Sequence, residues 1–470
     1  MIAPRTAHAA TPRKSPRKAA PQRVSATAAK AAAPARAAPA ATAAVLPAQG
    51  PGAGRLSLPP YETVALVLQG GGALGAYQAG VYQGLAEAGI EPNCFSGISI
   101  GALNTALIAG NPPERRIARL TEFWETICQL NLALPVTPFW EQSLFNTNDA
   151  MRRNMSALHA AGAVLVGQKG FFRPRMPPPA ITTPGNPAAA SYYDTSALSE
   201  TLERLCDFDL INSHSLRVSV GAVNVRTGNF VHFDNAETRL EPRHFLASGA
   251  LPPAFPAIEI DGEYYWDGGL VSNTPLSYVL ESRPRMDTLA FQVDLWSARG
   301  RVPTNMSEVS DRIQDIRYSS RTRQITDEMR RSQYLQHMVA YLLDKLPADE
   351  READKYCREV EALTCKKRYN IIHLIYQDKP YEEYYKDYQF GPGIMRDHWA
   401  CGLADIRATL AKPDYLLMPE NVSGFITHDV HRTRDVHHGE RAAVEQPRDS
   451  RENGRESQAR GRRDPGKNGR

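Results

Sequence analysis

Ser99, in the segment G-I-S-I-G at residues 97–101, has the sequence context of a catalytic nucleophile. The apolar run 93–98 predicts a strand entering this segment, and the run 100–109 predicts a helix leaving it. A strand–turn–helix around G-x-S-x-G exposes the serine hydroxyl at a helix N-terminus, where the helix dipole favours developing negative charge. At background residue frequencies the motif arises in roughly one chain of this length in six, so a structural turn with an idle serine is the alternative.

A second glycine-rich turn follows the apolar, β-branched run 63–68 and precedes a predicted helix over 75–88. Its glycines expose main-chain amides, and such amides stabilise the oxyanion of an acyl-transfer intermediate. Two adjacent strands that each end in a glycine-rich turn place these donors beside the nucleophile. The predicted donors are Gly70, Gly71 and Gly72, with Gly75 as motif support.

The same turn also matches the dinucleotide-binding pattern G-x-G-x-x-G. A dinucleotide site requires an acidic residue about 20 residues on, at the end of the second strand, to bind the ribose. That strand leads instead into Ser99, and Glu91 precedes it. A dinucleotide-binding protein therefore remains an alternative, but a disfavoured one.

A base for the serine is predicted at Asp267, in D-G-G after the β-rich stretch 257–266. The glycines allow close approach to the carboxylate, although D-G is also common in plain hairpin turns. An ordinary serine hydrolase requires a histidine after the acid. His337, in a charged helical segment, and His373, between apolar strand residues, could occupy that position, but a structural role is favoured for both.

These three blocks, in this order, resemble the patatin-like phospholipase family. Residues 246–256 (L-A-S-G-A-L-P-P-A-F-P) are similar to the segment before the family's aspartate, and the likeness spans roughly residues 63–280. Leu74 departs from the family, which often has Arg or Lys there, so charge assistance to the oxyanion is not expected. The segment after about residue 300 is similar to a C-terminal domain of unknown role found in some bacterial members.

The resemblance implies a three-layer α/β/α fold with a mostly parallel central sheet and a largely helical C-terminal region. It implies hydrolysis of a lipid carboxylic ester, as in phospholipase A, through a Ser99–Asp267 dyad and an acyl-enzyme, with no cofactor and no metal. A catalytically inactive scaffold is the remaining alternative. The residues assigned to motif support are Gly75, Gly97, Gly101, Gly268 and Gly269.

Composition sets the domain limits and the expected partners. Residues 1–55 contain nine Lys or Arg and no acid, and the other residues contain 46 basic and 51 acidic side chains. We expect a disordered basic Ala/Pro-rich arm at 1–58, the catalytic domain at 59–300, a mainly helical domain at 301–426 and a disordered polar tail at 427–470.

No run of about 18 apolar residues exists, and the N-terminus lacks the apolar core of a secretory signal. The six cysteines are scattered without zinc spacing, which suits a reducing compartment. We therefore expect a cytoplasmic protein with a lipid or phospholipid substrate and no nucleic-acid partner. Peripheral membrane contact is a secondary expectation, and the oligomeric state is not predicted.

Overall fold

The computed structural model describes residues 56–129, 148–179, 185–319, 322–379, 382, 385–420 and 424–430. All of them lie in one compact unit, Ala53–Arg470. The predicted disordered arm and tail lie outside these residues, apart from 56–58 and 427–430. Residues 427–429, which we assigned to the tail, instead belong to a strand, because their backbone pairs with residues 371–373.

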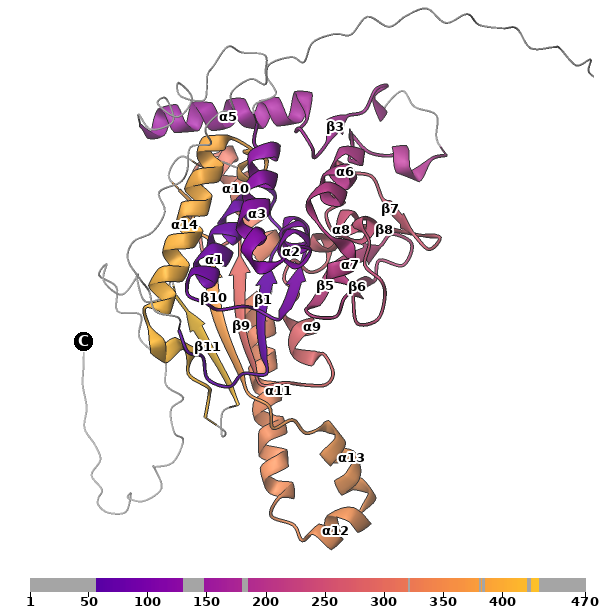
Figure 1. The fold of residues 1–470 in the computed structure, drawn as a ribbon, viewed down its shortest axis with the longest axis vertical. Helices are drawn as coiled ribbons and strands as arrows, with labels where there is room; N and C mark the ends of the chain where they lie inside the picture. Colours follow the sequence, from indigo (N-terminus) through magenta and orange to yellow (C-terminus); the bar gives the residue numbers. More distant parts are fainter. Residues whose placement is uncertain are drawn as a thin grey trace, which may run out of the picture. The chain divides into compact units, whose positions relative to one another are not determined.

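A nine-stranded sheet forms the centre of the unit, in the order β11-β10-β9-β1-β2-β5-β8-β7, with β6 also paired to β5 (Figure 1). The parallel strands are β1 (Thr63–Leu68), β2 (Cys94–Gly97), β5 (Arg217–Asn224), β9 (Thr288–Asp294), β10 (Tyr369–Ile375) and β11 (Phe425–Asp429). The antiparallel strands are β6 (Phe230–Asp234), β7 (Ile258–Ile260) and β8 (Glu263–Asp267). A separate two-stranded pair joins β3 (Arg173–Pro174) to β4 (Tyr193–Asp194).

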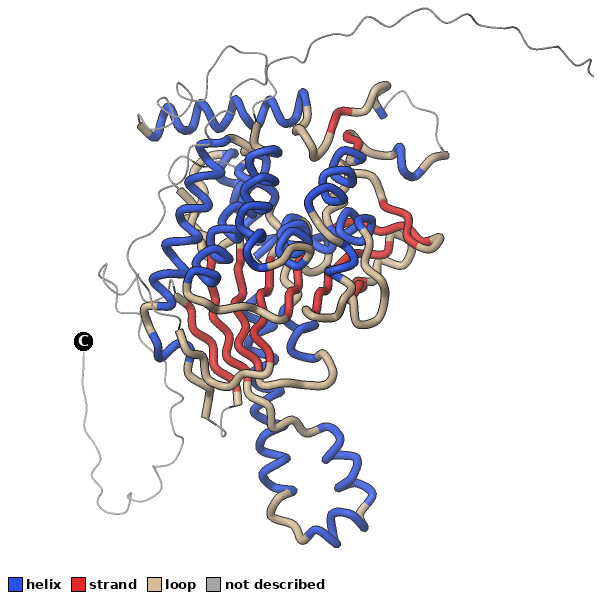
Figure 2. Tube along the Cα trace, in the orientation of Figure 1, coloured by secondary structure: helices blue, strands red, loops and turns tan. Residues whose placement is uncertain are grey.

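Helices cover both faces of the sheet because successive β1 side chains point to opposite faces. Leu66 and Leu68 pack in one large core, and Ala65 and Val67 in a second. The first core contains α1 (Ala76–Glu87), α2 (Ile100–Ala109), α3 (Pro113–Ile127) and α14 (Pro392–Leu410). The second contains α9 (Leu276–Glu281) and part of α11 (Thr322–Leu343). The predicted three-layer α/β fold with a mostly parallel sheet is confirmed, and Figure 2 shows the strands between helices.

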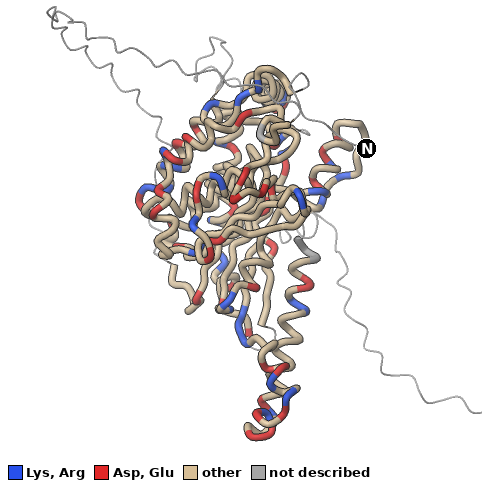
Figure 3. Tube along the Cα trace, turned by 90° about the vertical axis from the view of Figure 1, so that its right-hand side faces the viewer, with Lys and Arg blue, Asp and Glu red and all other residues tan. Residues whose placement is uncertain are grey.

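The remaining helices and 3-10 turns connect or extend these layers. They are η1 (Gly72–Gly75), α5 (Asp149–Val166), η3 (Pro187–Ala189), α6 (Ser196–Leu205), α7 (Phe208–Ile211), α8 (Pro242–Ser248), η4 (Gly268–Leu270), α10 (Met306–Ser319), α12 (Ala348–Ala353), α13 (Lys355–Leu363), η5 (Lys386–Tyr388) and η6 (Pro413–Leu416). Charged residues of both signs occur along α11–α13 (Figure 3).

The C-terminal region is largely helical, as predicted. It also supplies β10 and β11 to the central sheet, and α14 packs against α1 (Figure 1). The region therefore shares its hydrophobic core with the residues before 300. The limit at residue 300 stays a prediction.

Candidate active site

Ser99 lies in a sharp turn between β2 and α2. Its backbone has φ 55° and ψ −123°, a conformation that a non-glycine residue adopts only under strain. Its amide nitrogen lies 3.1 Å from both the carbonyl oxygen and Oγ of Ser248. Gly101 must be glycine, because a Cβ there would lie 2.3 Å from the carbonyl oxygen of Leu68. The turn therefore has the geometry of a nucleophile elbow.

Strand register places Asp267 beside Ser99, although the two are 168 positions apart in the chain. Gly97 of β2 pairs with Val220 of β5, so Ser99 lies level with Ala222, two residues further along. Ala222 pairs on its other side with Asp267, the last residue of β8. The antiparallel direction of β8 therefore brings its end to the height of the serine turn.

The Asp267 carboxyl group is almost completely removed from solvent, with 2% of the residue exposed. Burial raises its pKa to about 7, although hydrogen bonds from the Gly269 amide and the Ser99 hydroxyl lower it in part. The Gly269 nitrogen lies 2.7 Å from Oδ1. The structure thus brings a hydroxyl and a carboxyl into contact, with the carboxyl poised to change protonation state near neutral pH.

The glycine loop lies against this pair. A Cβ on Gly70 would lie 3.0 Å from the Cβ of Ser99, so the loop backbone and the serine are immediate neighbours. Among the described residues, the amides of Gly70, Gly71 and Gly72 donate to no backbone carbonyl. Three donors beside a hydroxyl, without backbone acceptors of their own, can hydrogen-bond an oxyanion.

Two side chains fix the position of this loop. The carbonyl oxygen of Gly70 accepts hydrogen bonds from Nδ2 of Asn273 at 3.0 Å and from Nε1 of Trp296 at 2.8 Å. Gln69 binds the same region, because its Oε1 accepts from the amides of Leu295 at 2.6 Å and Trp296 at 3.1 Å. The sequence analysis missed these residues. The position of Asn273 shortly after D-G-G was the available signal for it.

Ser99, Asp267 and the glycine loop open into one pocket with an empty volume of about 670 Å³, part of it open to solvent. The lining is mainly apolar and aromatic. Its apolar side chains are Ile100, Leu103, Phe171, Phe172, Leu251, Phe255, Trp296 and Phe390, and its other side chains are Ser99, Asp267, Asn273, Tyr318, Asp387 and Tyr388.

One wall of the pocket comes from the C-terminal region. Asp387, Tyr388 and Phe390 line it, and the ring of Phe390 lies 5.8 Å from that of Phe171 and 6.4 Å from that of Phe172. Phe171 and Phe172 lie in the loop between α5 and β3. No sequence signal pointed to residues 387–390, because they lie far from every motif.

The other residues singled out from the sequence lie as follows. The elbow glycine Gly97 packs on the Gly101 backbone. Of the other motif glycines, Gly75 packs on the side chain of Ile100, and Gly268 packs on the Gly221 backbone. Leu74 is fully buried in the core and carries no charge. Glu91 forms an ion pair with Arg116 at 2.9 Å, outside the pocket.

Neither candidate histidine lies at the serine. His337 lies on α11 with Nε2 3.0 Å from the carbonyl oxygen of Lys367, and His373 is buried within β10. All pocket-lining residues belong to the described part of the chain, and none is a histidine. In the same part, no group of three His, Cys, Asp or Glu side chains could hold a metal ion.

Two family models match the chain. The model described as patatin-like phospholipase matches residues 66–280, and the DUF3734 model, described as patatin phospholipase, matches residues 316–422. The chain belongs to the patatin-like phospholipase family. The first match includes all three motif blocks, so the resemblance seen in the sequence is confirmed. The second falls on the C-terminal region.

Two relatives share a short segment with this chain. Patatin-like phospholipase domain-containing protein 7 of Rattus norvegicus is 37% identical over 95 residues, and protein 6 of Homo sapiens is 37% identical over 91 residues. Each match covers 18% of this chain and 7% of the relative. Among solved structures, VipD from Legionella pneumophila is similar over 79% of this chain and 72% of its own, at 15% identity and a TM-score of 0.32.

Proposed function

We propose that this patatin-like phospholipase hydrolyses the carboxylic ester of a lipid through an acyl-enzyme on Ser99. The observation that carries the proposal is the contact between the Ser99 hydroxyl and the buried Asp267 carboxyl, beneath the glycine-loop amides and at the end of an apolar pocket. An apolar, aromatic lining matches an acyl chain better than a nucleotide or a sugar. The scaffold alternative explains neither the strained serine nor the paired carboxyl.

In the proposed mechanism the ionised Asp267 takes the Ser99 proton as Oγ attacks the ester carbonyl carbon. The amides of Gly70, Gly71 and Gly72 donate to the resulting oxyanion. When the tetrahedral intermediate collapses, the carbon–oxygen bond to the alcohol breaks and Asp267 returns the proton to the leaving alkoxide. Asp267 then takes a proton from a water molecule as its oxygen attacks the acyl carbon. The bond from that carbon to Ser99 Oγ breaks, Asp267 returns the proton to Oγ, and the fatty acid is released.

Contact with a lipid surface is part of this proposal. Exposed apolar side chains lie at the end of α5 and beside β3 and β4: Val164, Leu165, Val166, Met176 and Tyr192. The neighbouring Phe171 and Phe172 line the pocket, so this rim is continuous with the acyl site. In the part of the chain that the structure describes, no helix is long and apolar enough to cross a bilayer. The cytoplasm stays our expected compartment.

The test supplies the purified protein with phosphatidylcholine vesicles and with soluble p-nitrophenyl esters. We expect fatty acid release from the vesicles and a single fluorophosphonate adduct, located by mass spectrometry on Ser99. A folded protein that releases no acid and takes no label would be a scaffold. An adduct on another residue would disprove the assigned nucleophile.

The pH dependence should follow the protonation of Asp267. Because its pKa is raised to about 7, the base is protonated at lower pH, and kcat/KM should fall tenfold for each pH unit below that value. A rate profile between pH 5 and 9 measures the midpoint. Burial also raises the pKa of Asp387, in the same pocket, to about 7, so Asp387→Asn is the control and should keep the midpoint. A profile flat from pH 5 to 9 would contradict the role of Asp267.

A further inference from the structure

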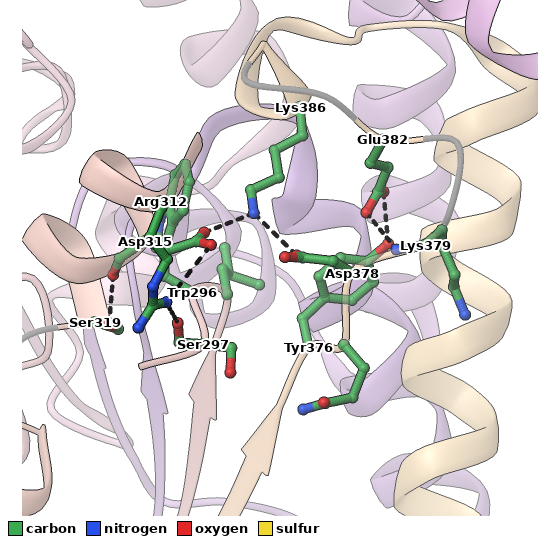
Figure 4. Close-up of polar contacts among 12 residues, drawn as sticks. Trp296, Ser297, Arg312, Asp315, Ser319, Tyr376, Asp378, Lys379, Glu382 and Lys386 are labelled. Atoms are coloured by element: carbon green, nitrogen blue, oxygen red, sulfur yellow. Dashed lines mark hydrogen bonds and ion pairs between the residues drawn. The ribbon is translucent and has the colours of Figure 1, made fainter. Parts of the chain in front are cut away.

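Lys386, at the start of η5, is a buried lysine close to the active site. Only 2% of the residue is exposed, and its Nζ donates to Oδ1 of Asp315 at 2.7 Å and to Oδ1 of Asp378 at 2.9 Å (Figure 4). Burial alone would lower the pKa of Lys386. The attraction of Asp378 and Asp315 outweighs burial and raises it, so the amine stays charged.

The lysine joins segments that are far apart in the chain. Asp315 lies on α10, Asp378 follows β10, and the ammonium lies over the ring of Trp296, after β9, at 5.1 Å from the ring centroid (Figure 4). We call Lys386, Asp315, Asp378 and Trp296 the Lys386 clamp. Its four members fix the ends of two central strands, one helix and η5 relative to one another.

The glycine loop is contacted by the clamp residue Trp296 and by Asp387, which follows Lys386 in the chain. The indole of Trp296 donates to the carbonyl oxygen of Gly70 at 2.8 Å. The carbonyl of Asp387, next to Lys386, lies against Gly72, where φ is 56° and a Cβ would come within 2.3 Å of that oxygen. Both points belong to the predicted oxyanion loop, so movement of the clamp changes the direction of its amides.

The attraction within a buried ion pair often stabilises the protein by less than the loss of hydration of its two charges costs. Replacing all the charges by neutral groups is therefore often tolerated. Removing one partner alone is strongly destabilising, because it leaves an unpaired buried charge. Stability is therefore a weak reason for pairing the buried Lys386 with the buried Asp315 and the partly exposed Asp378 at this place. A fixed geometry for the neighbouring loop is a stronger one, since Trp296 and the residue that follows Lys386 both contact that loop.

We propose that Lys386 is a positioning residue of the active site, which holds Trp296 and the segment 385–390 against the glycine loop and so aims the amides of Gly70, Gly71 and Gly72 at the oxyanion. The inference rests on the proposed function. It gives the region matched by the second family model a role: this region supplies Lys386, Asp378 and one wall of the acyl pocket.

The test removes the clamp without leaving a charge unpaired among its members. In the triple variant Lys386→Met, Asp315→Asn, Asp378→Asn we expect kcat to fall about 10- to 100-fold while KM changes less than about twofold, because oxyanion donors act in the transition state. Affinity for a trifluoromethyl ketone, which forms an oxyanion on the serine, should fall by a similar factor. Lys366→Met, the same change at an exposed lysine paired with Asp344, is the control and should match the wild type.

Trp296→Phe is a second, milder variant. It keeps an aromatic ring under the lysine and in the pocket wall but removes the hydrogen bond to Gly70, so we expect kcat to fall about tenfold and KM to change less than kcat. This variant tests the inference even if the triple variant does not fold.

The outcomes separate the two proposals. If the wild type is active and the folded triple variant and Trp296→Phe keep wild-type kcat and ketone affinity, the clamp has no positioning role and the proposed function stands. A loss that follows only the unfolded fraction, measured by circular dichroism in the same buffer, also overturns the inference. If the wild type cleaves no ester, the proposed function fails, and the inference fails with it.

Discussion

Replacing Ser99 by alanine should lower ester hydrolysis by about 10⁵- to 10⁶-fold, the loss seen when a serine hydrolase loses its nucleophile. The variant keeps the glycine loop and the pocket, so it should still bind the lipid while forming no acyl-enzyme. Alanine meets the same backbone strain as serine at φ 55°, and we therefore expect the melting temperature to stay close to the wild-type value. Fatty acid release and fluorophosphonate labelling measure the two effects.

Ser215→Ala is the matched control for this variant. Ser215 is exposed on the loop before β5, where its Oγ lies 2.9 Å from Oγ of Ser213. This control should be labelled and should turn over like the wild type. A Ser99→Ala protein that retains more than about one hundredth of the wild-type rate would show that another group attacks the ester, since a loss this small is far below that of a nucleophile.

Replacing Asp267 by asparagine should lower kcat by about 10⁴-fold, because Asp267 is the carboxyl group that the Ser99 hydroxyl contacts. Asparagine has nearly the same shape, and its oxygen can still accept the hydrogen bond from the Gly269 amide. The loss therefore reports on proton transfer and not on packing. Single-turnover hydrolysis of a p-nitrophenyl ester separates acylation from product release.

The same substitution should not destabilise the protein at pH 8. The pKa of Asp267 is about 7 in the folded state and 3.8 as a reference, so the folded state holds this proton more tightly than the unfolded state does. In the wild type, stability from this group therefore falls as pH rises from about 4 to about 7. Asparagine carries no charge to bury, so its melting temperature at pH 8 should equal or exceed that of the wild type.

Asp261→Asn is the control for this prediction. Asp261 lies in the turn between β7 and β8, its side chain is exposed, and asparagine tolerates its φ of 53°. Its activity should match the wild type. If Asp267→Asn stays active, the Ser–Asp assignment fails. If His337→Ala or His373→Ala is as inactive as Asp267→Asn, the dyad assignment also fails, and a histidine must be part of the mechanism.

Local patterns predicted the elements that carry the site. The apolar run at 63–68 and the glycines after it are sufficient to indicate a buried strand and an exposed turn, because a parallel strand buried on both faces needs a continuous apolar run. The strand–turn–helix around Ser99 followed from the same argument. The strand Phe425–Asp429 was missed because its short, polar sequence gives no alternating or apolar pattern, and only pairing with β10 makes it a strand.

By itself, the sequence determined which residues are candidates for the chemistry of the proposed site: the hydroxyl of Ser99, the carboxyl of Asp267 and the amides of the glycine loop. Each is marked by its immediate neighbours, since turn geometry depends on adjacent residues. Only the tertiary structure decided that Ser99 and Asp267 flank β5 at the same height, and that Trp296, Lys386 and the wall at 387–390 meet the loop. These contacts join residues far apart in the chain, and local sequence carries no signal for the register and packing that bring them together.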